Sequence, residues 1–278
     1  MRHRKIQARF PTVIYMLFGA YVVQRNGEVH VASLLKLVVP FGFSANAIRL
    51  GLSRMSKHGV FRIRRVGRRS YYSLSEKGMK WMEQGRVRAF EVEHKQWDGK
   101  WRLVVYNIPE RLRVQRDKLR FKLLSLGFAK LSNSLWIAPH DFRTEIDQYM
   151  KDREMTGYVE TFVAEYTGYR PPREFAAIVW NITDLAKKYE VFVNKHTAMY
   201  AACNRVLQTG KELDMAECFA LRFCMTAEYV ALRLEDPMLP VEILPENWVG
   251  ARAQRLHDDL WGLLKPGADA FVDSVLSQ

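Results

Sequence analysis

Cysteine is scarce in this chain of 278 residues, and no two cysteines form a C-x-x-C pair. The three residues are Cys203, Cys218 and Cys224, and an odd number cannot all be joined by disulfide bonds within one chain. A complete disulfide framework, of the kind that holds small secreted domains together, is therefore excluded. We expect reduced, buried thiols and a cytoplasmic protein.

Long hydrophobic runs are also missing. The first ten residues are basic and residues 12–23 (TVIYMLFGAYVV) are apolar, as in a signal peptide, but no small-x-small cleavage site follows them. The run is too short to cross a bilayer, and no later stretch reaches transmembrane length. We interpret the run as a first core helix and expect no membrane partner.

The motifs of common enzyme active sites do not occur in the sequence. It contains no G-x-S-x-G nucleophile elbow, no H-E-x-x-H zinc motif, no Walker loop and no G-x-G-x-x-G glycine loop. The seven histidines are scattered, and none stands at metal-ligand spacing from a cysteine or an aspartate. We therefore predict no catalytic residue, no metal site and no cofactor, and we do not expect an enzyme.

Positive charge, in contrast, is abundant and unevenly distributed. Residues 1–95 hold 19 lysine and arginine residues against 5 aspartate and glutamate residues, a net charge of +14. Residues 96–278 hold 24 against 25, a net charge of −1. A basic segment joined to a neutral remainder indicates a polyanion-binding head with another function behind it.

Three helices are predicted in this basic segment. Residues 12–24 form the first, and residues 30–43 form the second, which should stop near Pro40. Ser44 is a suitable N-cap for the third helix, and Gly59 is a suitable stop. Two helices joined by a short turn that contains proline and glycine match a helix-turn-helix.

The third predicted helix has two different faces. Ile48, Leu52 and Met55 are spaced so that they share one side, which should be buried. The opposite side is polar and basic, and arginine and asparagine side chains can pair with guanine and adenine edges in the major groove. The residues of this helix that we expect at the DNA are Ser44, Asn46, Arg49, Ser53, Arg54 and Lys57.

A basic hairpin is predicted directly after this helix. Residues 60–65 alternate as a strand does, Gly-Arg-Arg at 67–69 is the expected turn, and residues 70–74 form the return strand. Neighbouring residues on a strand face opposite ways, so one of the two adjacent tyrosines should pack on the core, and the sequence leaves open which one. The hairpin residues that we expect at the DNA are Arg65, Arg68, Arg69 and Tyr71.

A polar helix face or a charged hairpin is usually only a solvated surface when it occurs alone. Here both occur in order within the segment of charge +14, and a helix-turn-helix followed by a basic hairpin is a winged helix. The combination favours DNA binding, in which Arg68 and Arg69 contact phosphate or the minor groove while the helix reads base edges.

Three stretches carry a resemblance to a known family. Residues 40–78 (PFGFSANAIRLGLSRMSKHGVFRIRRVGRRSYYSLSEKG), 97–110 (WDGKWRLVVYNIPE) and 235–261 (EDPMLPVEILPENWVGARAQRLHDDLW) resemble the PaaX family of bacterial repressors of phenylacetic acid catabolism. The resemblance implies an α+β protein with an N-terminal winged helix-turn-helix, a central ferredoxin-like domain and a C-terminal helical domain. It also implies a homodimer on double-stranded operator DNA, released by an aryl-CoA thioester, typically phenylacetyl-CoA. The corresponding domains are residues 1–95, 96–170 and 171–278.

The central part of the chain supports this division by its own pattern. A linking helix is predicted over residues 75–96, and residues 101–166 then give the order strand, helix, strand, strand, helix, strand of a ferredoxin-like unit. This unit resembles the small nuclease-like subunit of the CRISPR adaptation machinery, which places a metal-binding aspartate at the end of the first strand. Asn107 stands there instead, and a neutral amide is a poor ligand for a hard divalent cation. We expect a domain that dimerises or positions the winged helices.

The last part of the chain is predicted to be helical after a stiff linker at Pro171 and Pro172. An effector pocket needs an apolar and aromatic lining with a few polar groups. The residues that we select for it are Arg222, Glu228, Trp180 and Tyr189. Arg222 and Glu228 could equally form a buried ion pair with each other, and the sequence singles out no cations for the phosphates of CoA.

The interpretation is a cytoplasmic, dimeric repressor of a phenylacetate-type operon that leaves its operator when an aryl-CoA thioester binds. One alternative is a metal-dependent nuclease built on the central domain, which Asn107 opposes. Another is a protein that binds nucleic acid without sequence preference, which would show steep salt dependence and no preference for an operator.

Overall fold

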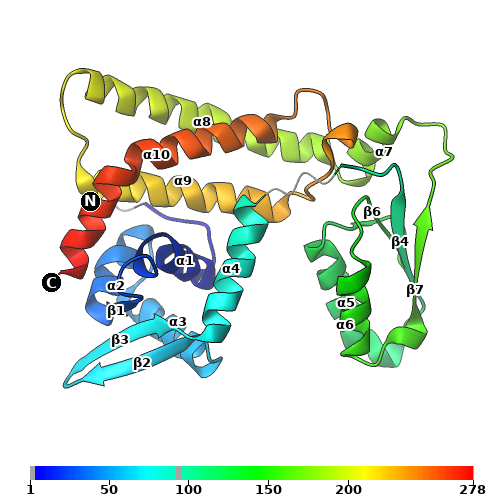
Figure 1. Cartoon of the computed structure of the whole chain (residues 1–278), viewed down its shortest axis with the longest axis horizontal. Coiled ribbons are helices and arrows are strands. Elements are labelled where there is room, and N and C mark those ends of the chain that lie inside the picture. The colour runs from blue at the N-terminus through cyan, green and yellow to red at the C-terminus, as the bar shows by residue number, and fades with distance from the viewer. Residues whose placement is uncertain (1–3, 92–95, 278) are drawn as a thin grey trace. The chain divides into compact units, whose positions relative to one another are not determined.

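The computed structural model describes residues 4–91 and 96–277, in which helices accompany two small antiparallel sheets (Figure 1). This confirms the predicted α+β class. The described residues cluster into two compact units. We call the described residues of Met1–Glu91, Lys188–Leu234 and Val249–Gln278 the head unit, and those of Val92–Lys187 and Glu235–Trp248 the ferredoxin-like unit.

The N-terminal part of the head unit, which we call the winged head, combines three helices with a three-stranded sheet. Its elements are α1 (Phe10–Leu17) with a π-helical turn (Phe18–Val22), β1 (Glu28–His30), α2 (Val31–Val38), α3 (Ala45–Lys57), β2 (Phe61–Val66) and β3 (Arg69–Leu74). β3 lies between β1 and β2 and is antiparallel to both. This is the arrangement expected of a winged helix-turn-helix. The sequence did not predict β1, because three residues carry too little periodicity.

Local signals determine the turn between α2 and α3. A 3-10 turn at Val39–Phe41 leads to Gly42, whose φ of +92° favours glycine. The hydroxyl of Ser44 then accepts a hydrogen bond from the N–H of Ala47 at 3.1 Å, as the predicted N-cap should. The chain direction changes by 119° between α2 with its 3-10 turn and α3, which lies within the range of helix-turn-helix motifs.

In the part of the chain that the structure describes, no single helix is long and apolar enough to cross a bilayer. Only α2 with its 3-10 turn and α3, taken together as a pair bent by 119°, are long and apolar enough by length and composition.

The inner face of α3 is buried as predicted. Ile48 and Leu52 are fully buried and Met55 is almost so. On the same helix, Gly51 lies against α1: a Cβ at this position would stand 2.2 Å from the ring of Phe10. The two helices therefore approach closely, and the outer face of α3 is held in one orientation relative to α1.

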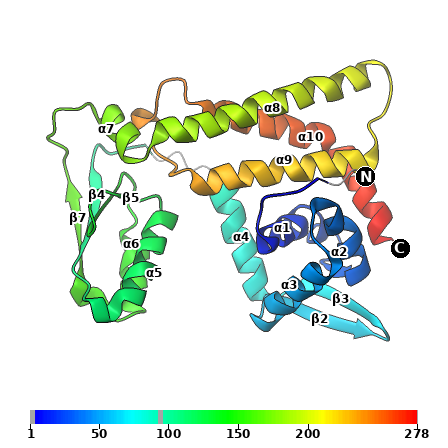
Figure 2. The same ribbon diagram turned by 180° about the vertical axis from the view of Figure 1, so that it is seen from behind.

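Long helices complete the head unit (Figures 1 and 2). α4 (Glu76–Phe90) follows the hairpin, and its predicted continuation through residues 92–95 lies outside the described residues. The others are α8 (Ile182–Gln208), which starts in the ferredoxin-like unit, α9 (Met215–Glu235) and α10 (Val249–Leu276). The ring of Phe41 stacks on Phe223 of α9 at 4.7 Å, and the hydroxyl of Ser33 donates to the carbonyl of Val275 in α10 at 3.2 Å.

The ferredoxin-like unit has the strand and helix order that the sequence predicts. Its elements are β4 (Trp101–Tyr106), α5 (Arg113–Ser125), β5 (Ala129–Lys130), β6 (Leu135–Ala138), α6 (Arg143–Lys151), β7 (Val159–Ala164) and α7 (Pro172–Val179). The sheet has the antiparallel order β5-β6-β4-β7. This order places the first strand of the unit in the middle of the sheet, next to the last one.

Two apolar layers cover the two faces of this sheet. One contains Leu119 and Leu123 of α5 with Ile146 and Met150 of α6. The other contains Ala176 of α7, the start of α8 and the segment 239–244. Residues 171–187 and 235–248 thus pack with the ferredoxin-like sheet and not with the remaining C-terminal helices.

Candidate functional site

The outer face of α3 consists of exposed polar and basic side chains. Asn46, Arg49, Ser53, Arg54 and Lys57 are all exposed. Within the described residues, no hydrogen bond or ion pair occupies the three cationic side chains among them. The predicted contact residues of this helix therefore share one accessible face, with Ser44 at its N-terminal end.

The turn of the hairpin is shorter than predicted. Gly67 and Arg68 alone form it, and Arg69 already pairs with Val66 as the first residue of β3. Gly67 has a φ of +57°, which makes a two-residue turn possible. Arg68 is thus at the tip, and Arg69 is at the base of the turn.

The arginines of the hairpin fall into two groups. The Arg64 guanidinium donates to Glu28 at 2.5 Å and lies over the Tyr71 ring at 4.6 Å, while Arg62 donates to Glu76 at 3.1 Å. The hydrogen bond from Arg64 lowers the pKa of Glu28 below its ordinary value. Arg65, Arg68 and Arg69 are exposed and have no carboxylate partner among the described residues. We call these three side chains the free wing arginines.

The two tyrosines of β3 divide as a strand requires. Tyr72 packs edge-on against Phe61 at 5.7 Å, on the side of the head core. Tyr71 lies on the other face, against His30 at 5.2 Å and beneath Arg64. The tyrosine predicted at the DNA is therefore the outward one, although it is only half exposed and already contacts a guanidinium.

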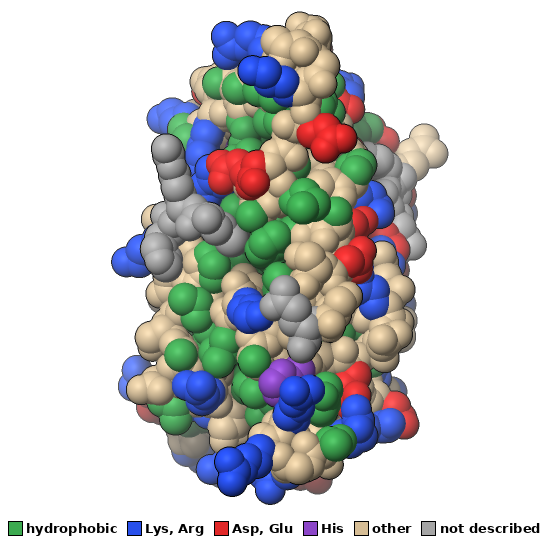
Figure 3. Space-filling view, turned by 90° about the vertical axis from the view of Figure 1, so that its left-hand side faces the viewer, with side chains coloured by type: hydrophobic (Ala, Val, Ile, Leu, Met, Phe, Trp, Pro, Cys, Tyr) green, Lys and Arg blue, Asp and Glu red, His purple; other side chains and the backbone are tan. Residues whose placement is uncertain are grey.

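The charge distribution is visible on the surface of the molecule. In Figure 3, most charged side chains at the lower end are lysines and arginines. This end is where the β2–β3 hairpin projects in Figure 1. Acidic side chains are more frequent higher on the same face.

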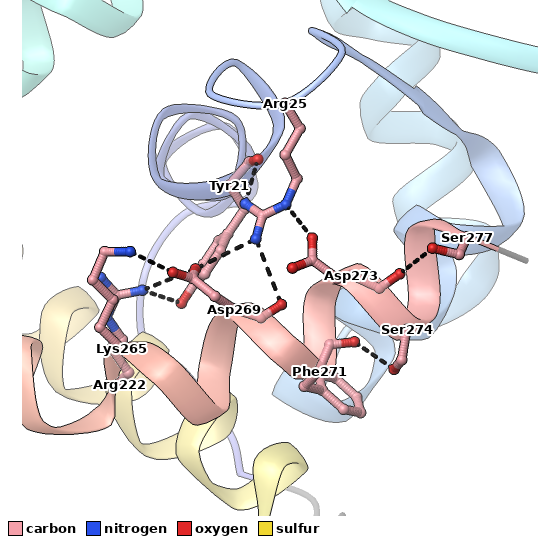
Figure 4. A network of polar contacts seen from close by, with 9 residues as sticks. All are labelled: Tyr21, Arg25, Arg222, Lys265, Asp269, Phe271, Asp273, Ser274 and Ser277. Carbon is pink, nitrogen blue, oxygen red and sulfur yellow. Dashed lines mark hydrogen bonds and ion pairs between the residues drawn. The ribbon is translucent and has the colours of Figure 1, made fainter.

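The predicted effector residue Arg222 is the buried centre of a polar network that reaches the surface at Lys265 (Figure 4). Its guanidinium donates to the hydroxyl of Tyr21 at 3.0 Å, lies 3.9 Å from Asp269, and covers the ring of Trp261 at 3.4 Å. Asp269 also binds Lys265 at 2.5 Å and Arg25 at 3.5 Å. The network ties α9 and α10 to the end of the π-helical turn.

The other predicted effector residues lie elsewhere. Glu228 accepts hydrogen bonds from Lys195 at 2.6 Å and His196 at 3.0 Å, so it does not pair with Arg222. Burial alone would raise the pKa of Glu228, but these two hydrogen bonds outweigh it and lower the pKa. Tyr189 is buried in the core of the head unit. Trp180 belongs to the ferredoxin-like unit, where its indole N–H donates to the carbonyl of Gly127 at 2.9 Å. The structure does not bring these four residues into one site.

The head unit instead contains a cavity of about 390 Å³ that the sequence did not indicate. α1 with the π-helical turn, α4, α9 and α10 contribute to its walls. None of the four predicted effector residues lines it. The only sequence hint was the spacing of His257 and Trp261, which places both rings on one face of α10.

Metal ligands and reactive thiols are the remaining candidates. Asn107 is exposed at the end of β4, and its backbone N–H donates to the carbonyl of Tyr158 at 2.9 Å. Across residues 4–91 and 96–277, no cluster of three or more His, Cys, Asp or Glu side chains is placed to hold a metal ion. Burial raises the pKa of Cys218 and of Cys224 to about 11, so neither is a thiolate at neutral pH.

Three family models match successive parts of the chain. Residues 9–78 match the family model described as PaaX-like protein, residues 94–176 match the PaaX protein central Cas2-like domain, and residues 180–274 match the PaaX-like protein C-terminal domain. The transcriptional repressor PaaX of Escherichia coli (strain K12) is 28% identical over 264 residues, which are 94% of this chain and 82% of the relative.

A solved structure shares the fold. An uncharacterized protein of Mycobacterium tuberculosis, Rv0674, superposes with a TM-score of 0.60 at 20% sequence identity. The match covers 95% of this chain and 97% of the other.

Proposed function

The chain belongs to the PaaX family, and from this premise we propose that it is a DNA-binding transcriptional repressor of a phenylacetate-type catabolic operon. Its winged head binds double-stranded operator DNA, and an aryl-CoA thioester such as phenylacetyl-CoA releases it. Such a repressor acts in the cytoplasm, where the operon lies.

The observation that carries the proposal is the set of cations without partners on the winged head. Arg65, Arg68 and Arg69 of the hairpin have no carboxylate to neutralise them within the described residues. Phosphate contacts give binding energy and register but no sequence information. We assign this sequence-independent contact to the free wing arginines and to Lys57.

Sequence readout is assigned to the outer face of α3. Arg49 and Asn46 are the side chains suited to bidentate pairing with guanine and adenine, and Ser53 adds a hydroxyl that can donate or accept. The hydroxyl of Ser44 is already engaged as the N-cap, so this residue supports the helix start at the phosphate backbone. The wing at one side and α3 at the other would then contact adjacent grooves of one half-site.

A homodimer completes the proposal. Two winged heads related by a two-fold axis fit an operator of inverted-repeat character, because palindromic sites mirror the symmetry of the protein. Release requires that the effector bind more tightly to a state in which the two heads no longer fit their half-sites, since equal affinity for both states would shift nothing.

The test is a footprint of the purified protein on the DNA upstream of its own gene, with and without a panel of aryl-CoA thioesters. We expect a protected inverted repeat that is lost when one thioester is added. Equal protection of operator and unrelated DNA would favour the non-specific alternative. Protection that no thioester relieves would remove the effector from the proposal.

A further inference from the structure

The cavity of the head unit has no part in the DNA contacts proposed above. It has a volume of about 390 Å³, at the lower end of the range for small-molecule sites. The exposed residues Trp81 and Gly85 of α4 lie on its lining and mark where it meets solvent. A cavity of this size holds a ring with a short acyl chain, but not the nucleotide part of a thioester, which has to remain outside.

One wall of the cavity is flat and aromatic. Phe90, His257 and Trp261 line it, and the Trp261 ring stacks on His257 at 5.8 Å with 25° between the planes. Phe90 lies 5.6 Å from the same imidazole ring. Tyr229 stacks on His257 at 4.4 Å and 19°. An aromatic ring placed in the cavity therefore meets aromatic side chains, and aromatic pairs favour offset-stacked or edge-to-face arrangements.

The polar groups of the wall suit an uncharged carbonyl. Burial lowers the pKa of His257, and its hydrogen bond to Asp258 offsets only part of this, so the imidazole is neutral at neutral pH. Its Nδ1 lies 2.9 Å from the Asp258 carboxylate, which assigns the proton to Nδ1 and leaves Nε2 as an acceptor for the Thr226 hydroxyl at 3.4 Å. This long bond leaves the hydroxyl free to donate to a ligand carbonyl instead.

A free carboxylate is less well suited to this site. Arg86, the arginine on the lining, already donates to Glu83 and Glu91, at 2.6 and 2.5 Å. Arg222 does not line the cavity and is bound to Tyr21 behind the wall. Asp258 adds a negative charge to the lining.

We infer that this cavity binds the aromatic acyl group of an uncharged acyl derivative, with the Thr226 hydroxyl donating to the acyl carbonyl. The choice of a thioester as that derivative rests on the proposed function.

The walls of the cavity come from two parts of the head unit. α1, the π-helical turn and α4 belong to its N-terminal segment, and α9 and α10 belong to its C-terminal helices.

The cavity is mechanically connected to the DNA-binding face. α4 follows β3 of the wing through Ser75, whose hydroxyl donates to the carbonyl of Gly59 at 2.5 Å. Gly78 of α4 lies so close to the hairpin that a Cβ there would stand 2.3 Å from the carbonyl of Val60. On the other wall, Phe10 of α1 packs on Gly51 of α3. A ligand that moves α4 or α1 away from α9 and α10 therefore carries the wing and α3 with it.

Two glycines provide a matched test. Gly85 in α4 lines the cavity and Gly262 in α10 does not, and a Cβ at either position meets no atom within 4 Å. Gly85→Leu should therefore fill the cavity without disturbing the fold, and Gly262→Leu is its control. Calorimetric titration with phenylacetyl-CoA, without DNA, should give an affinity about tenfold or more lower for Gly85→Leu and an unchanged affinity for Gly262→Leu.

Further probes test the chemistry of the site. Acetyl-CoA and phenylacetate should both bind more weakly than phenylacetyl-CoA, since one lacks the ring and the other carries a charge. Thr226→Val should weaken binding of phenylacetyl-CoA several-fold, and Thr226→Ser, which keeps the hydroxyl, should restore it.

Equal affinities of the two glycine variants, or no binding of phenylacetyl-CoA by the wild type, would overturn the assignment of the cavity even if the footprint identifies an operator. Binding of acetyl-CoA as tight as that of phenylacetyl-CoA would overturn the aromatic part of the assignment. Loss of binding only in Gly85→Leu supports the cavity even if no operator is found, because this measurement does not involve DNA.

Discussion

The two compact units differ in whether their arginine side chains have carboxylate partners. In the ferredoxin-like unit most arginines have a carboxylate partner, for example Arg102 with Asp98 at 2.7 Å and Arg116 with Glu110 at 3.0 Å. In the winged head, Arg49 of α3 and the free wing arginines have none among the described residues. Exposed ion pairs contribute little to stability, so unpaired cations cost the fold little. Unpaired cations instead make the surface potential more positive, and a positive surface attracts polyanions.

The head unit differs in one further respect, because it also buries a guanidinium group. Arg222 is only 1% exposed and has the Tyr21 hydroxyl and the Trp261 ring as its main partners. In the ferredoxin-like unit, the clusters between the helices and the sheet consist of apolar side chains. The head unit thus relies on a specific polar contact between its N-terminal and C-terminal parts.

The largest effect that we predict follows from this buried arginine. Arg222→Ala should destabilise the head unit by about 3–5 kcal/mol, because it leaves a cavity and removes the bond to Tyr21. Arg113→Ala, which removes an exposed pair in the ferredoxin-like unit, should cost about 1 kcal/mol or less. Urea unfolding followed by circular dichroism measures both. If Arg222→Ala lowers the free energy of unfolding as little as Arg113→Ala does, the polar network does not hold the two parts of the head unit together.

A smaller effect is expected at the exposed face of α3. Arg49→Ala should cost roughly 1–3 kcal/mol of binding free energy on the operator and much less on random DNA, because it removes a contact to a base edge. Arg113→Ala again serves as the control in the other unit and should change neither value. Fluorescence anisotropy on the two duplexes measures the difference. Equal losses on both duplexes would assign Arg49 to the DNA backbone.

The smallest effect concerns pH. Burial lowers the pKa of His257 in the folded head unit, whereas an unfolded histidine titrates near about 6.5. Between these two values the unfolded state binds more protons, so the stability present above about pH 6.5 is lost as the pH falls. In the ferredoxin-like unit, the hydrogen bond from Arg102 lowers the pKa of Asp98 to about 2, and its contribution is lost only as the pH falls from 3.8 through that value.

The head unit should therefore open before the ferredoxin-like unit on mild acidification. Amide hydrogen exchange, followed by mass spectrometry between about pH 7 and pH 5, measures the two units separately. His257→Gln should reduce the pH dependence of the head unit. If both units lose protection together, or if the variant behaves as the wild type does, His257 is not the titrating group.

Much of the winged head was predictable because its signals are local. The N-cap at Ser44, the stop near Pro40, and the spacing of Ile48, Leu52 and Met55 each act within a few residues, and the structure confirms all of them. The hairpin was also predicted, apart from its turn, where Gly67 allows two residues instead of three.

The remaining features depend on contacts that a sequence does not display. Glu28 neutralises Arg64 across 36 positions, so the sequence could not tell a paired wing arginine from a free one. The cavity wall joins the first helix to α4, α9 and α10, and an aromatic residue beside a cavity has no different pattern from one in a filled core. Trp180 shows this, since it was expected near an effector and packs instead on Trp101 of the ferredoxin-like sheet.

The most direct test of the account is the salt dependence of DNA binding by two double variants of equal charge. Arg68→Ala with Arg69→Ala removes two free wing arginines, and Arg113→Ala with Arg170→Ala removes two exposed, carboxylate-paired arginines of the ferredoxin-like unit. The slope of log K against log salt should decrease in magnitude by about 2 for the first variant and remain unchanged for the second. An unchanged slope in the wing variant, or an equal decrease in both, would contradict the assignment of DNA binding to the unpaired cations of the winged head.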